Sequence, residues 1–255
     1  MASRVTVYPK ETIVDRGLSV AWYDLDEKNR AQYFSWLHNT YIPKLLKSPR
    51  VLWAAHYKSD PSLTPPPILR HTKDPLPAGN AYIFMLGAED AHAFSALTPY
   101  NQKGKIDPAD AKMLAMRVGE RRNIFTEEHR VEGPQAKTRE GEYTPAPCIQ
   151  LGSFNAGSPE DEDELLAWYA DYRLPVVGAM SSALGMRKLS SVSGWAKHGV
   201  LYEFTSLADR ANTFRQQVAK TKEQEDWNTA VVKKLVHAPG SPNVAERIYP
   251  PPPRR

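Results

Sequence analysis

The chain has 255 residues, of which 41% are hydrophobic and 24% charged, and these fractions are typical of a globular protein rather than a disordered one. The formal net charge of +4 is small and basic residues are interspersed with acidic ones, so the composition indicates no nucleic-acid partner. A single cysteine excludes an intramolecular disulfide framework, and the lack of any apolar run of about 18 residues excludes a membrane-spanning helix. The first ten residues have no apolar signal core, so we expect a cytoplasmic protein with no membrane partner.

The first half of the chain alternates between strand and helix patterns. Short apolar runs predict strands over three segments: 18–23, 51–57 and 82–86. The spacing of Phe34, Leu37 and Tyr41 predicts a helix over 27–41, which Pro43 is expected to end or kink.

A second helix is predicted to begin at Asp107-Pro108, because aspartate is a good N-cap and proline suits the first helical turn. We expect this helix to run to about residue 122 and to carry a basic cluster, Arg117, Arg121 and Arg122, on its exposed face. A strand is then predicted over 125–131, followed by a polar linker over 132–147.

An internal repeat organises the sequence. Trp36 and Trp168 lie 132 residues apart, and so do Pro43 and Pro175; the same offset aligns apolar runs upstream and downstream of them. We therefore expect two copies of a strand–helix–strand–strand–helix–strand unit, over 1–132 and 148–250. The first copy carries a proline-rich insert over 59–80, which must be a loop and is either a lid or a surface flap.

This element order predicts an α+β fold. Each βαββαβ unit is ferredoxin-like, with a four-stranded antiparallel sheet and helices on one face. The other face of the sheet must be buried, and a second copy in the same chain can cover it. Two tandem units would then form a pseudo-dimeric α/β barrel with its helices outside.

The residues around Trp36 carry a family resemblance. A Trp-x-x-x-x-His-x-Pro string after the first strand is typical of the dimeric α/β-barrel (ferredoxin-like) superfamily, and the chain resembles its EthD-like branch as a tandem fusion. The family histidine falls at Tyr41 in the first copy and at Arg173 in the second, while His38 lies one helical turn earlier. The resemblance implies a protein that binds or converts a small molecule, because members of the superfamily include cofactor-free monooxygenases, cyclases, isomerases, dehydratases and haem proteins.

The candidate catalytic residues are His38 and Tyr41, which share the predicted helix face toward the sheet. An imidazole can act as general acid or base near neutral pH, and a phenol can donate to a substrate carbonyl or developing oxyanion. For the substrate-binding pocket we expect aromatic walls and two further polar groups, contributed by Trp22, Tyr23, Phe34, Trp53, His56 and Arg173. Arg173 suits a substrate carboxylate or a surface ion pair.

Nucleotide, P-loop, zincin and hydrolase signatures do not occur, and no histidine pair has metal-ligand spacing, so we expect neither a metal nor another cofactor. The sequence thus predicts a cofactor-independent enzyme acting by general acid/base chemistry on a small aromatic or polyketide-like oxygenated metabolite, as a lyase, dehydratase, cyclase or isomerase. The alternatives are a cofactor-free monooxygenase and a non-catalytic small-molecule binding protein. Whether two molecules of this protein associate into a homodimer through their helices stays open.

Overall fold

A computed structural model describes residues 14–62, 68–97, 105–139, 145–214 and 221–251 of the chain. Parts of the predictions made above lie outside the described residues: 1–13 and 98–104 in the first copy, 63–67 in the proline-rich insert, 140–144 in the linker and 215–220 in the second copy. No helix among the described residues is long and apolar enough to cross a membrane.

The two halves of the chain place their long strands and the helices between them in the same order, and each half has one additional two-residue strand, β3 or β9. The first half contains β1 (Gly17–Leu25), α1 (Glu27–Trp36), a π-helical turn η1 (Leu37–Tyr41), α2 (Ile42–Leu45), β2 (Val51–Ser59), β3 (Arg70–His71), β4 (Tyr82–Ala88), η2 (Ala91–Leu97), α4 (Pro108–Leu114) and β5 (Arg117–Glu132). The second half, after the short helix η3 (Ala136–Thr138), contains β6 (Cys148–Asn155), α5 (Pro159–Trp168), a π-helical turn η4 (Tyr169–Arg173), α6 (Leu174–Gly178), β7 (Ala183–Ser193), β8 (His198–Phe204), α7 (Leu207–Phe214), α8 (Lys222–Lys234), β9 (Val236–His237) and β10 (Asn243–Tyr249).

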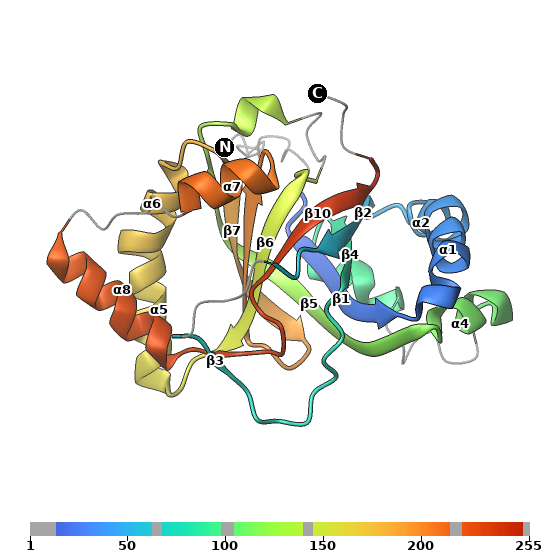
Figure 1. The fold of residues 1–255 in the computed structure, drawn as a ribbon, viewed down its shortest axis with the longest axis horizontal. Helices are drawn as coiled ribbons and strands as arrows, with labels where there is room; N and C mark the ends of the chain where they lie inside the picture. Colours follow the sequence, from blue (N-terminus) through green and yellow to red (C-terminus); the bar gives the residue numbers. More distant parts are fainter. Residues whose placement is uncertain (1–13, 63–67, 98–104, 140–144, 215–220, 252–255) are drawn as a thin grey trace, which may run out of the picture.

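The long strands close into an antiparallel barrel (Figure 1). Their order is β10-β2-β4-β1-β5-β7-β8-β6, and a further pairing between β10 and β6 joins the two ends. Each half gives its last strand to the other: β5 pairs with β7, and β10 pairs with β2. The expected α+β barrel is confirmed, and its closure leaves no free edge among these strands.

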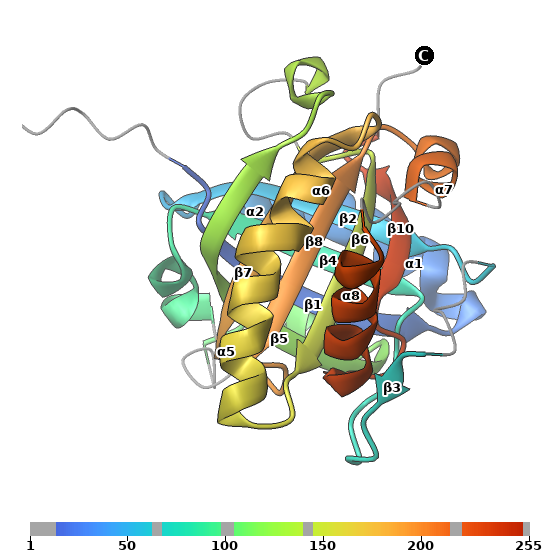
Figure 2. The same cartoon turned by 90° about the vertical axis from the view of Figure 1, so that its left-hand side faces the viewer.

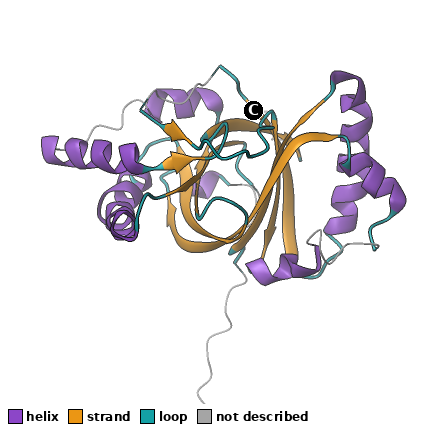
Figure 3. Cartoon of the chain, turned by 90° about the horizontal axis from the view of Figure 1, so that it is seen from below, coloured by secondary structure: helices purple, strands orange, loops and turns teal. Residues whose placement is uncertain are grey.

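The helices lie on two opposite sides of the barrel. Helices α1, α2 and α4 of the first half cover one side, while α5, α6 and α8 of the second half cover the other (Figures 1 and 2). Figure 3 shows the strands enclosed between these two helical layers. Side chains on each strand therefore alternate between the barrel interior and a helix-covered outer face.

This alternation separates neighbouring residues of β1. Trp22 lies in the interior cluster with Leu18 and Val20, and Tyr23 lies in the outer cluster beneath α1 with Leu37. Both aromatic residues are fully buried. Two side chains that are adjacent in sequence thus serve two separate compartments.

The helix predicted over 107–122 is shorter than expected. Asp107 does cap it, because its carboxylate accepts a hydrogen bond from the Ala109 amide at 2.8 Å, but α4 ends at Leu114 and β5 begins at Arg117. The basic cluster therefore lies on a strand, and Arg117 and Arg121 are not exposed as predicted. Pairing with β1 stabilises these residues as a strand, and β5 pairs with β7 only from Ile124 onward.

Both prolines of the repeat follow a widened helical turn instead of ending the helix. Pro43 lies two residues after η1 and Pro175 two residues after η4, and a short α-helical segment continues past each. Proline cannot donate a backbone hydrogen bond, and a π-turn just before it changes the bonding pattern at that point. The two turns start 132 residues apart, at Leu37 and Tyr169.

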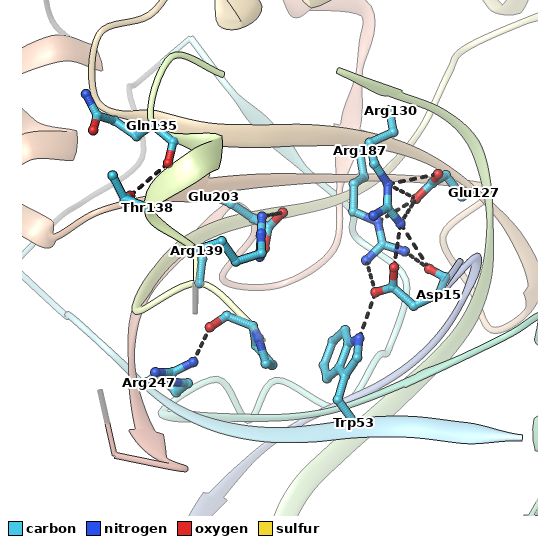
Figure 4. Close-up of polar contacts among 12 residues, drawn as sticks. Asp15, Trp53, Glu127, Arg130, Gln135, Thr138, Arg139, Arg187, Glu203 and Arg247 are labelled. Atoms are coloured by element: carbon cyan, nitrogen blue, oxygen red, sulfur yellow. Dashed lines mark hydrogen bonds and ion pairs between the residues drawn. The ribbon is translucent and has the colours of Figure 1, made fainter. Parts of the chain in front are cut away.

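One end of the barrel is closed by an ion-pair network (Figure 4). The Asp15 carboxylate accepts from Trp53 Nε1 at 2.7 Å, from Arg187 Nη1 at 3.0 Å and from Arg130 Nη2 at 2.7 Å. Glu127 accepts from Arg187 Nε at 2.6 Å, and beside this group Arg139 and Glu203 form a bidentate pair. Trp53, predicted as a pocket wall, therefore belongs to this end of the barrel interior.

The described part of the proline-rich insert lies against the second half of the chain. Strand β3 pairs in parallel with β9, and His71 Nε2 lies 2.8 Å from the carbonyl oxygen of Ser241. Farther along, the Trp195 indole donates to Asp74 at 2.7 Å. Whether the insert acts as a lid stays a prediction.

Candidate functional site: a histidine pair beneath the first helix

Three of the predicted site residues form one hydrogen-bonded chain. The hydroxyl of Tyr23 on β1 lies 2.9 Å from His56 Nε2 on β2, and His56 Nδ1 lies 2.9 Å from His38 Nε2 on the π-turn. Tyr23 and His56 are fully buried, whereas His38 is partly exposed. His38 Nδ1 makes no hydrogen bond to any described residue. These three hydrogen-bonded side chains thus extend from the core to an imidazole at the surface.

Aromatic side chains surround the two imidazoles. Phe34, also predicted for the site, stacks on His38 with ring centroids 5.5 Å apart and meets His56 edge-on at 5.0 Å. On the other side, Tyr249 of β10 stacks on His38 at 4.4 Å. Because β10 belongs to the second half of the chain, both halves contribute to the surroundings of this imidazole.

A buried arginine lies behind the chain. The Arg117 guanidinium sits over the Tyr23 ring, 4.5 Å from its centroid, and its Nε donates to the Tyr33 hydroxyl at 2.6 Å. Glu120 pairs with the same guanidinium. The positive charge of Arg117 therefore faces the inner end of the Tyr23–His56–His38 chain.

This environment favours neutral imidazoles. Burial lowers the pKa of His38 to about 4. The pKa of His56 is lowered well below its ordinary value, first by burial and then by the charges of His38 and Arg117. Burial also raises the pKa of Tyr23 well above that of a free phenol. At neutral pH the side chains of Tyr23, His56 and His38 are therefore uncharged, and they can donate and accept hydrogen bonds.

The other predicted site residues lie elsewhere. Tyr41 stacks on Trp36 at 4.6 Å instead of joining His38, so the two candidate catalytic groups are not brought together. Trp22 and Trp53 lie inside the barrel, on the opposite face of the sheet from His38. Arg173 lies in the second half, where it donates to the Tyr202 hydroxyl at 2.9 Å.

The second half carries a different set of groups at the matching place. The offset of 132 residues relates His56 to Lys188, which is also buried. Lys188 Nζ lies 3.0 Å from His198 Nδ1 and 3.1 Å from Glu128, and His198 Nε2 lies 2.6 Å from Glu162. This lysine is paired, so the histidine chain with its partner-free nitrogen belongs to the first half.

Sequence reasoning missed Arg117 and Tyr33. Arg117 was placed on an exposed helix face, although its position opposite Leu25 on β1 brings it next to the candidate site. Tyr33 has helical spacing with Trp36 and is fully buried, so its pattern carried a signal for core position but none for the hydrogen bond to Arg117. The pairing of β5 with β1 places Arg117 within reach of Tyr33, and the sequence alone does not show that pairing.

His38, His56 and His198 do not suit haem, which the superfamily resemblance implies for some members. Haem iron needs an axial ligand in an apolar cavity. His56 and His198 use both ring nitrogens within the protein, and His38 is stacked between two aromatic rings. Among the described residues, no group of three or more histidine, cysteine or acidic side chains could hold a metal ion.

Comparisons with known proteins were made by sequence and by structure. Neither a family model nor a curated protein sequence matches this chain. Solved structures match along nearly its whole length, and three of them are described below. A candidate monooxygenase from Fusobacterium nucleatum has a TM-score of 0.55 at 11% identity and covers 93% of this chain and 94% of its own.

The other two structures give the same picture. An anthrone oxidase-like protein has a TM-score of 0.54 at 8% identity, with 92% of each chain covered. A candidate chlorite dismutase has a TM-score of 0.53 at 12% identity and covers 91% of this chain and 93% of its own. At such low identity the likeness shows the fold, and fold alone does not fix an activity. The chain therefore has the fold of the dimeric α/β-barrel proteins, with both barrel halves in one polypeptide.

Proposed function

We propose that this protein is an enzyme in which His38 acts as the general acid/base on a small aromatic, oxygenated substrate. The observation that carries the proposal is the Tyr23–His56–His38 chain, which ends at a partly exposed imidazole with one nitrogen that has no partner among the described residues. The aromatic rings of Phe34 and Tyr249 flank this imidazole and suit a flat, apolar substrate.

The hydrogen-bond chain supports a base at His38 Nδ1. When His38 Nε2–H donates to His56 Nδ1, and His56 Nε2–H donates to the Tyr23 oxygen, the Nδ1 of His38 carries a lone pair. A proton taken up there stays on His38, because the charge of Arg117 disfavours a cation at His56. A weak base of this kind suits an already acidic proton, such as a phenolic O–H or a C–H flanked by a carbonyl and aromatic rings.

A cofactor-free oxygenation is the second candidate function, and the monooxygenase and anthrone oxidase-like neighbours favour it. Removal of a proton from an activated CH₂ group leaves a carbanion that can reduce dioxygen. One oxygen atom then enters the product as a carbonyl, and the other leaves as water with the two hydrogens. This step begins with the same base.

Anthrone provides a test because its CH₂ group is acidic and its oxidation is visible. We expect turnover, or exchange of the CH₂ hydrogens with deuterated solvent, and a loss of roughly 10²–10⁴-fold in His38→Gln. The matched control is His129→Gln, since that residue lies exposed on β5. Retention of the full rate in His38→Gln would refute the proposal. Oxygen uptake distinguishes oxygenation from proton transfer, and binding without conversion would indicate a binding protein.

We also propose that the two halves derive from one duplicated unit, with boundaries near 1–132 and 148–250. The shared element order and the equal offset of the two π-turns support this origin. The EthD-like branch rests on the residues around Trp36 and stays a prediction. The role of Tyr41 as a phenol donor likewise stays a prediction, which Tyr41→Phe tests in the anthrone assay.

A further inference from the structure

Arg121 is a buried cation without a carboxylate partner. It lies on β5 opposite Trp22 of β1, near the end of the barrel away from the Asp15 network, and only 9% of its surface is exposed. Its guanidinium sits over the Trp22 ring, 4.6 Å from the centroid. No carboxylate of the described residues lies within 4 Å of it. Burial lowers the pKa of Arg121 to about 10, so the group still carries its charge at neutral pH.

The unused hydrogen-bond donors of Arg121 lie on one edge. Its Nη1 donates to the carbonyl oxygen of Gly79 at 2.7 Å, whereas Nε and Nη2 have no partner in the part of the chain that the structure describes. These two N–H groups point in parallel from the planar guanidinium and form the fork that binds two oxygens of one carboxylate. The charge of Asp24 acts on Arg121 and raises its pKa, opposing the effect of burial, but Asp24 makes no hydrogen bond to the fork. Its Oδ1 instead accepts from the Asn80 and Ala81 amides at 2.9 and 2.8 Å.

Other unpaired polar atoms gather at the same end of the barrel. Trp22 Nε1, Ser153 Oγ and Asn243 Oδ1 are buried and have no hydrogen-bond partner. Strand register places Ser153 two residues beyond Leu151, and it places Asn243 opposite Leu151, so both follow the interior-facing pattern of β6 and β10. Buried polar groups are nearly always paired in folded proteins, so several unpaired ones in one compartment indicate a missing polar partner.

We propose that this end of the barrel binds a small organic acid, whose carboxylate accepts two hydrogen bonds from the Nε/Nη2 edge of Arg121. A single guanidinium matches a single negative charge, and the fork matches two coplanar oxygens better than it matches a tetrahedral phosphate. The Trp22 indole supplies an aromatic surface and a third donor beside it. This site is separate from the one at His38, since Trp22 and Tyr23 face opposite sides of the sheet.

Calorimetric titration with acetate, benzoate and salicylate tests the proposal on the intact chain. We expect the wild-type protein to bind at least one of these carboxylates and Arg121→Gln to bind it at least about tenfold more weakly, because a charge-assisted pair is lost. Arg121→Lys keeps the charge but not the fork, and should also bind more weakly. The matched control is Arg122→Gln, because Arg122 is next in sequence, has a side chain 40% exposed and pairs with Glu120. Benzamide, which lacks the charge, should not compete with benzoate.

Several outcomes would overturn the proposal. One is that none of the three carboxylates binds, and another is that Arg121→Gln and Arg122→Gln bind them equally. If inorganic phosphate binds more tightly than the carboxylates and its binding depends on Arg121, the ligand of this site is a phosphate and not a carboxylate. Carboxylate binding that is lost in His38→Gln would place the ligand at the outer site, whereas retention there confirms a separate interior site even if His38 proves inactive. Circular dichroism of each variant shows whether it is folded.

Discussion

At the scale of single residues, the Tyr23 hydroxyl and His56 Nε2 form a hydrogen bond in the core, where water cannot take the place of either partner. Tyr23→Phe should lower the free energy of unfolding by about 1–3 kcal/mol, because it leaves His56 Nε2 buried without a partner. Urea denaturation measures this change. Tyr172→Phe is the matched control, since Tyr172 is also buried and its hydroxyl has no bond to any described residue. Equal losses in both variants would contradict the expectation.

The neutral histidines also give a pH dependence. Burial lowers the pKa of His38 and of His237 from 6.5 to about 4, so the unfolded chain binds more protons than the folded one between these values. The free energy of unfolding should therefore fall as the pH drops from about 6.5 to 4. At 1.36 kcal/mol per pH unit, the buried His237 alone corresponds to roughly 3 kcal/mol.

An NMR titration of the histidine ring protons checks the pKa values directly. We expect the His38 signals to shift near pH 4, and the anthrone rate, if His38 is the base, to stay level down to about pH 5. A His38 transition near the ordinary value of 6.5 would show that the imidazole is solvated rather than buried.

At the scale of elements, α1 and α4 are joined by a buried carboxylate. Asp110 of α4 accepts from Trp36 Nε1 at 2.9 Å and from Lys44 Nζ at 2.6 Å. Asp110→Ala should lower the free energy of unfolding by about 1–3 kcal/mol, because the indole N–H loses its partner. Thermal unfolding measures the effect. Asp226→Ala, at an exposed i,i+4 pair, should change it by under about 0.5 kcal/mol.

The sequence predicted those elements whose signal is local. Apolar runs located β1, β2 and β4, and the repeat located the helix–strand order of the second half, because strand alternation and helical spacing are properties of short segments. The predicted start of β5 was wrong because the segment from Arg117 to Arg122 has no apolar alternation, and pairing with β1 makes it a strand.

The candidate site was predicted in part for the same reason. His38, His56, Tyr23 and Phe34 come from elements whose faces the sequence indicated, and the structure brings them together. Tyr41 was expected beside His38, but the π-turn alters the helical spacing after Leu37 and Tyr41 stacks on Trp36. Tyr249 could not be foreseen, because it reaches His38 only through the pairing of β10 with β2.

At the scale of the whole molecule, the two halves are connected by charge as well as by strands. Arg187 of β7 contacts Asp15 and Glu127 of the first half and is almost fully buried. Arg187→Leu should lower the free energy of unfolding by about 3–5 kcal/mol, because two buried carboxylates lose a counter-charge. Arg50→Leu, at a partly exposed ion pair, is the control and should have a small effect.

This network also sets the behaviour in acid. Burial raises the pKa of Asp15, but the charges of Arg187 and Arg130 more than offset it, and the net pKa lies below its ordinary value of 3.8. The stability that Asp15 contributes is therefore present above pH 3.8 and is lost as the pH falls through the lower folded value. Arg187→Leu should begin to unfold at a higher pH than the wild type in an acid titration followed by circular dichroism.

The placement of β10 between β2 and β6 has a consequence for biosynthesis. During translation all the other barrel strands leave the ribosome before β10. The backbone edges of β2 and β6 that pair with β10 therefore have no partner until residues 243–249 emerge. Such edges are prone to pair with other chains. A nascent chain stalled before residue 243 should therefore recruit chaperones and self-associate, whereas the released chain should resist proteolysis.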